Sequence, residues 1–215
     1  MTELRYTLVS DGPSDSVLQH HLTWLLQQHI NVETAVAAEW ADLRFVTPRP
    51  RSLAERIRCA IELYPCDLLF VHRDAEREKR EKRVDEIAGG VASLATPRPI
   101  SVCVVPVWMQ EAWLLFDEYS IRQAAGNPRG RVPLVIPKAN EVEQLPDPKA
   151  ILYQLLKLAS EQRGRRLRKF SVQRAAKRVA DLIDDFAPLR QLSAFNALEK
   201  DLIQVLQSHD WTQRN

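Results

Sequence analysis

Cysteine is scarce in this chain, and its three copies form no recognisable framework. Cys59, Cys66 and Cys103 are an odd number at wide spacing, and no Cys-x-x-Cys pair occurs. The sequence therefore indicates neither a zinc site nor a set of disulfides, and no His-x-x-x-His pair offers zinc ligands instead. This use of cysteine is typical of a reducing compartment, so we expect a cytoplasmic location.

Long apolar runs are missing as well. The longest are far shorter than the ~20 residues that span a bilayer. The amino-terminal residues lack the basic segment followed by an apolar segment that marks a signal peptide. Internal repeats and low-complexity tracts are also absent. The sequence thus predicts a globular protein with no membrane partner, and its 215 residues are enough to bury a core without disulfides.

No charge sign dominates overall, because 30 basic and 28 acidic residues leave a net charge of only +2. The distribution is uneven, however: residues 163–178 hold eight Arg or Lys and no acid. A block of this kind suits contacts with phosphates. The alternative is a solvated helix face whose acidic partners lie elsewhere in the fold. The candidate nucleic-acid contacts are Arg163, Arg165, Arg166, Arg168 and Lys169.

Apolar, β-type segments alternate with amphipathic segments over the first 125 residues. Strands are predicted at 5–10, 41–48, 66–76 and 99–108, and helices at 14–29, 52–64, 76–94 and 109–126. Ser52 and Glu55 have the spacing of a capping box at the start of the second helix. Strands separated by helices of this length predict an α/β fold with a mostly parallel sheet flanked by helices.

The segment 126–148 interrupts this alternation. It contains five prolines and predicts an irregular connection. Amphipathic helices are predicted beyond it, near 148–162, 171–185 and 194–208. We therefore expect an α/β core at 1–125, followed at 126–215 by a Pro-rich connection and a helical C-terminal extension packed on that core.

Carboxylates follow three of the predicted strands. Asp11 and Asp15 follow the first strand, Asp74 and Glu76 the third, and Glu111 the fourth. Functional groups in an open α/β sheet collect outside the carboxyl ends of the strands, so these acids converge if the first and third strands are neighbours. Mg²⁺ prefers oxygen ligands and relieves the repulsion between clustered carboxylates. The alternative for Asp74 and Glu76 is a pair of solvated loop charges.

Several of these segments carry a resemblance to a known fold family. The turn LVSDGPSD looks like the VEGxSD turn, and VHRDAE like the DxD turn, of the TOPRIM fold found in topoisomerases, primases and overcoming-lysogenisation-defect nucleases. VPVWMQEAWLLFD and LPDPKAILYQLL are similar to segments of a bacterial branch of small TOPRIM-like proteins. The resemblance covers roughly residues 5–120. Asp11 stands where the family has Glu, and Glu76 where it has the second Asp.

The resemblance implies a nuclease that hydrolyses phosphodiester bonds of DNA or RNA with Mg²⁺ or Mn²⁺. It also implies that the protein acts together with a partner ATPase in antiviral defence. Association into a homo-oligomer is left open. The alternative is a degenerate binding or assembly module, and a third interpretation is an enzyme for small phosphorylated molecules. The implied metal ligands are Asp11, Asp15, Asp74, Glu76 and Glu111; the implied catalytic residues are Asp11, Asp74, Glu76, Glu111 and Lys149.

Overall fold

The computed structural model describes residues 2–76, 78–95, 98–209 and 211, and the chain divides into two compact units. Unit 1 comprises residues 1–107 together with 194–215, and unit 2 comprises 108–193. This division differs from the predicted boundary after residue 125. Helix α4 (Glu118–Ala124) packs against α5 and α7 inside unit 2, whereas the last helix, α8 (Ser193–Ser208), bonds to helices of unit 1.

Unit 1 is built on a sheet of four parallel strands in the order β2-β1-β3-β4. The strands are β1 (Thr2–Val9), β2 (Thr34–Trp40), β3 (Leu68–His72) and β4 (Ser101–Val104). The predicted α/β class is confirmed. The first and third strands are neighbours, which is the condition under which the acids that follow them lie at one edge. Tyr6 pairs with Leu68 and Val9 with Val71, so β1 and β3 end at the same edge of the sheet.

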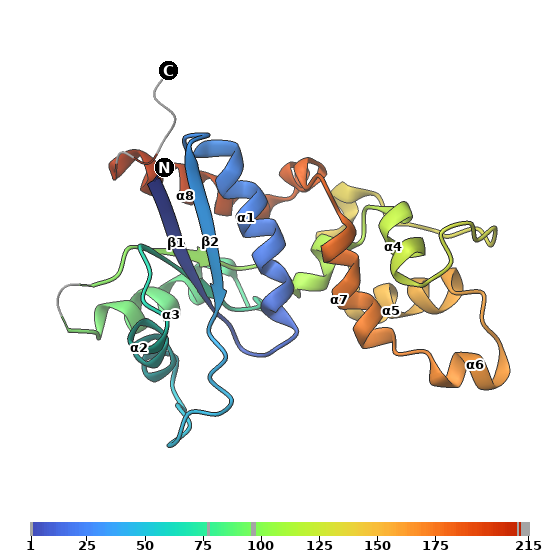
Figure 1. The fold of residues 1–215 in the computed structure, drawn as a ribbon, viewed down its shortest axis with the longest axis horizontal. Coiled ribbons are helices and arrows are strands. Elements are labelled where there is room, and N and C mark those ends of the chain that lie inside the picture. Colours follow the sequence, from blue (N-terminus) through green and yellow to red (C-terminus); the bar gives the residue numbers. More distant parts are fainter. Residues whose placement is uncertain (1, 77, 96–97, 210, 212–215) are drawn as a thin grey trace. The chain divides into compact units, whose positions relative to one another are not determined.

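Helices cover both faces of this sheet (Figure 1). They are α1 (Leu18–His29), preceded by a 3-10 turn at Asp15–Val17, α2 (Leu53–Leu63), α3 (Arg80–Ala92) and α8. The predicted capping box of α2 is confirmed, since the Ser52 side chain accepts from the Glu55 amide and Glu55 accepts from the Ser52 amide. None of the helices in the described ranges has both the length and the apolar character needed to cross a bilayer.

Alternate residues of the central strands face different helices, as expected of a sheet that is covered twice. Tyr6 faces α1, where its hydroxyl contacts Thr23 Oγ1 at 2.8 Å and donates to the carbonyl of Gln19 at 3.0 Å, and its ring meets Phe70 edge-on. The opposite face packs on α2 and α3 in one apolar cluster. Its buried members are Val9, Ala41, Ile57, Ala60, Leu69, Val71, Ala75, Ile87 and Val105.

The position of the second strand was predicted wrongly. Residues 41–48 form turns and irregular backbone, and the strand lies earlier, at Thr34–Trp40. The segment TAVAAEW contains three alanines, which have low strand propensity, so propensity alone does not predict a strand there. Pairing with β1 along seven residues, from Thr2 with Thr34 to Leu8 with Trp40, overrides that local preference.

Unit 2 is helical. Its longer helices are α4, α5 (Pro148–Ala159), α6 (Gly164–Lys169) and α7 (Val172–Leu182), and 3-10 turns occur at Gln110–Leu114, Ala139–Gln144 and Ala187–Gln191. The irregular segment before α5 is confirmed. The single helix predicted at 109–126 is wrong, because Asp117 caps the start of α4 and separates it from the 3-10 turn. Helix α6 was not predicted.

Candidate functional site

The loops after β1 and β3 bring two predicted acids to one buried histidine. His72 ends β3 and is 1% exposed. Its Nδ1 lies 3.0 Å from the carbonyl oxygen of Val104, to which it donates, and its Nε2 lies 3.4 Å from Asp74 Oδ1. Burial by itself lowers the pKa of His72, but the hydrogen bond and charge of Asp74, with the charge of Asp15, outweigh burial and raise it. From the sequence, His72 could be a ligand or a proton shuttle, but a hydrogen-bonded loop histidine is the favoured interpretation.

Asp15 holds the turn that follows β1. Its carboxylate accepts hydrogen bonds from the amide of Gly12 at 2.9 Å and from the hydroxyl of Ser14 at 3.0 Å. The residue is 7% exposed, so these bonds satisfy a buried charge. This local role explains an aspartate at the start of the 3-10 turn without any metal.

Asp11, by contrast, pairs with arginines. Its Oδ1 lies 2.6 Å from Arg56 Nη2 and 3.4 Å from Arg73 Nη1. Both guanidinium groups come from elements far from Asp11 in the sequence, α2 and the end of β3. The Asp11 carboxylate is therefore neutralised by two cations in this structure.

Glu76 is the most exposed of the predicted acids on unit 1. Its side chain is 65% exposed and its backbone is left-handed, with φ of 55°. Arg83 Nη2 lies 4.0 Å from its carboxylate, and Arg83 Nε donates to the backbone oxygen of Asp74 at 3.1 Å. Arg83 thus holds the loop that carries Asp74 and Glu76.

These acids do not fit a shared Mg²⁺ or Mn²⁺ ion in this conformation. Across the described residues, no group of three or more His, Cys, Asp and Glu side chains is arranged to hold a metal. The partners give the physical reason, since Asp11 is bound to arginines and Asp15 to its own turn. The predicted metal site of unit 1 stays a prediction.

Two further predicted residues form an ion pair inside unit 2. Lys149 Nζ lies 3.0 Å from Glu111 Oε1, and the Glu111 side chain is only 7% exposed. Lys149 sits in the first turn of α5, where the helix dipole is unfavourable for a cation. The buried carboxylate of Glu111 accounts for that placement, so the pair has a structural explanation. Their predicted catalytic roles remain predictions.

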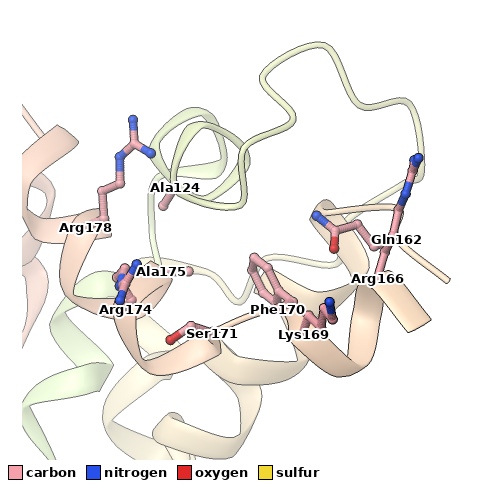
Figure 2. Close-up of a pocket in the computed structure, with 9 residues that line it drawn as sticks. All are labelled: Ala124, Gln162, Arg166, Lys169, Phe170, Ser171, Arg174, Ala175 and Arg178. Carbon is pink, nitrogen blue, oxygen red and sulfur yellow. The ribbon is translucent and has the colours of Figure 1, made fainter. Parts of the chain in front are cut away.

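The basic stretch of unit 2 surrounds a cavity of about 460 Å³, which we call the basic cavity. Its cations are Arg166 and Lys169 from α6 and Arg174 and Arg178 from α7, and Phe170 lies between the two pairs (Figure 2). Ala124 of α4 and Ala175 of α7 contribute to the lining. The cavity therefore combines four positive charges with one aromatic ring.

The predicted contacts coincide with this cavity only in part. Arg166 and Lys169 line it, whereas Arg163, Arg165 and Arg168 do not. Arg174 and Arg178 were missing from the predicted set. They lie four residues apart, and a helical reading of the whole basic stretch would have placed them on one face of α7.

The cations of the basic cavity are exposed and unpaired. Arg166, Lys169, Arg174 and Arg178 have no carboxylate partner in the part of the chain that the structure describes. The nearby acid Glu161 is engaged elsewhere: amides of Val132 and Arg131 donate to its carboxylate and lower its pKa. Within the described ranges, these four residues therefore do not have the acidic partners that the alternative of a solvated helix face requires.

Searches of family models, of curated proteins and of solved structures found no match to this chain.

Proposed function

We propose that this protein binds the phosphate backbone of nucleic acid through the basic cavity of unit 2. The observation that supports this most strongly is the gathering of four unpaired cations from two helices around one cavity. Arg and Lys neutralise backbone phosphates and release condensed counterions, which gives affinity without sequence preference. The other interpretation of a basic stretch, pairing with acids of the same fold, is not met for these residues.

Phe170 extends the proposal to unpaired bases. Its ring is partly buried and lies between Arg174 and Lys169 (Figure 2). An aromatic ring beside a cationic track is the arrangement by which proteins bind single strands, because any base can stack on it. We therefore propose that single strands are preferred over duplexes.

A binding titration tests the proposal. A fluorescent single strand of mixed sequence is titrated with the full chain and followed by anisotropy. We expect binding at low salt by the native chain and loss of at least about tenfold in affinity in the variant Arg166→Gln/Lys169→Gln/Arg174→Gln/Arg178→Gln. Strands of other sequences should bind alike. Absence of binding by the native chain, or equal affinity of the variant, would contradict the proposal.

Metal-dependent cleavage of phosphodiester bonds is the second candidate. The observation that favours it is the 3.4 Å contact of Asp74 Oδ1 with His72 Nε2 at the carboxyl end of β3, where the charge of Asp15 also raises the pKa of His72. This candidate requires carboxylates to leave the partners that they have in this structure. It agrees with the TOPRIM-like resemblance, which also suggests a partner ATPase.

The cleavage candidate is tested on plasmid DNA and RNA with Mg²⁺ or Mn²⁺, with the chain alone and together with a genomically neighbouring ATPase. We expect products from the native chain and none from Asp74→Ala, with matching circular dichroism spectra showing that the variant is folded. Equal cleavage by both chains would remove Asp74 from the reaction. No cleavage under any condition would leave the binding function alone.

A further inference from the structure

A second cavity, of about 260 Å³, lies in unit 1 where β1 and β2 end. We call it the arginine cavity, because four arginines line it: Arg44, Arg49, Arg51 and Arg56. They come from the segment after β2 and from α2, which follow each other in the chain. Asp11 is the only acid among the described residues that line it, where positive side chains outnumber negative ones four to one.

These arginines are only partly neutralised by the protein. Arg56 pairs with Asp11, and Arg44 forms a two-bond pair with Asp42, at 2.8 and 2.6 Å. Arg49 has no ion pair within the ranges that the structure describes. A cavity with surplus guanidinium charge is electrostatically suited to an anion.

One donor inside this arrangement is left without an acceptor. The Nε–H of Arg56 is buried and has no hydrogen-bond partner among the described residues. A buried donor that stays unpaired is costly, so this N–H adds to the charge that the protein leaves uncompensated beside the cavity. The same guanidinium already donates through Nη2 to one anionic oxygen, Asp11 Oδ1, at 2.6 Å.

The wall of the cavity is held in place by hydrogen bonds. The indole N–H of Trp40 donates to Ser10 Oγ at 2.9 Å, and the Ser10 hydroxyl donates to the carbonyl of Gly12 at 3.2 Å. The Gly12 amide in turn donates to Asp15. These bonds join the ends of β1 and β2, so the cavity is formed before any ligand arrives, which lowers the cost of binding.

Hydrogen bonds within the protein already occupy several backbone amides beside the cavity, so these amides are not available to bind a ligand. The Gly12 amide is used by Asp15, and the amides of Arg51 and Ser52 at the start of α2 are used by the carboxylate of Glu55. Backbone amides at this helix start therefore do not serve as the anion site. Recognition falls to arginine side chains, whose planar forks bind phosphate oxygens two at a time.

We propose that the arginine cavity binds a phosphate monoester. The volume is below the range typical of sites for drug-sized ligands, about 300–1,000 Å³, so it suits the phosphate and sugar of a nucleoside monophosphate, with the base outside the cavity. A monoester carries close to two negative charges at neutral pH, matching the surplus of arginine better than a singly charged backbone diester does. This site lies in unit 1 and does not depend on the function proposed for unit 2.

The test is calorimetric titration of the full chain with AMP, with adenosine as the uncharged control. We expect AMP to bind and adenosine not to bind. Arg49→Gln/Arg51→Gln should weaken AMP binding by about tenfold or more. Arg58→Gln, an exposed arginine of α2 outside the cavity, is the matched control and should leave the affinity unchanged. Asp11→Asn should strengthen binding, because the competing carboxylate charge is removed.

Equal heats for AMP and adenosine would overturn the proposal, as would equal weakening by the Arg49/Arg51 and Arg58 changes. Two sources of the phosphate are separated with short strands that carry either a 5′-phosphate or a 5′-hydroxyl. These are tested in Arg174→Gln/Arg178→Gln, which weakens the basic cavity. Tighter binding of the 5′-phosphorylated strand than of the 5′-hydroxyl strand assigns the site to a strand end. Equal binding of the two strands, with AMP still bound, assigns it to a free phosphorylated molecule.

Discussion

The salt dependence of binding gives a quantitative test of the basic cavity. Each phosphate contact on a single strand contributes about −0.7 to the slope of log K against log salt concentration. The four cations of the cavity then correspond to a slope of about −2.8, so affinity should fall about 50-fold between about 50 mM and about 200 mM salt. Arg174→Gln/Arg178→Gln removes two contacts and should leave a slope of about −1.4, with a fall of about sevenfold.

A matched control separates local contacts from overall charge. Arg165→Gln/Arg168→Gln removes the same charge from α6, at residues that do not line the cavity. Anisotropy titrations at four or more salt concentrations should return a slope near that of the native chain for this control. Equal changes of slope in the two double variants would refute the reasoning, because binding would then follow net charge and not the cavity.

Three other changes have defined outcomes. Phe170→Ala should weaken single-strand binding by about 1–3 kcal/mol and duplex binding far less, as measured by anisotropy, whereas equal losses would exclude stacking. Since the pKa of His72 is raised above its ordinary value, about 6.5, its protonation stabilises the fold: the unfolding free energy should be greatest below that pH and fall as pH rises through the raised pKa. In urea titrations, the unfolding free energy of Asp74→Asn should fall less with rising pH than that of the native chain. An unchanged pH profile in this variant would argue against the interaction of His72 with Asp74. Lys149→Met should cost about 1–2 kcal/mol in urea unfolding, because it leaves the buried carboxylate of Glu111 without its cation, and an unaltered midpoint would show the pair to be neutral.

Local chemistry made much of the fold predictable. The apolar run ending at His72 marks β3, and Ser52 with Glu55 marks the start of α2. The five prolines of 126–148 mark the irregular segment. Two predictions were wrong because the structure there depends on strand pairing or on a single cap. The position of β2 is determined by its pairing with β1. Asp117 caps α4 and so divides the segment that its periodicity predicts to be one helix.

The candidate site was less predictable, because its side chains interact with residues that are far from them in the sequence. The acids after β1 and β3 were found from their positions at strand ends, and the structure shows that those strands pair. Nothing local to Asp11 predicts that Arg56, 45 residues away, bonds to it. Likewise, the contribution of Arg174 and Arg178 beside Arg166 depends on how α6 and α7 meet around Phe170.

The most direct test of the proposed function is to locate bound nucleic acid on the chain. A photoactivatable single strand is cross-linked to the full protein at low salt, and the modified peptides are identified by mass spectrometry. We predict cross-links concentrated in residues 162–178, with Phe170 among the modified positions. Cross-links confined to residues 1–107, or none above the level of the variant that lacks all four cavity cations, would contradict the central claim.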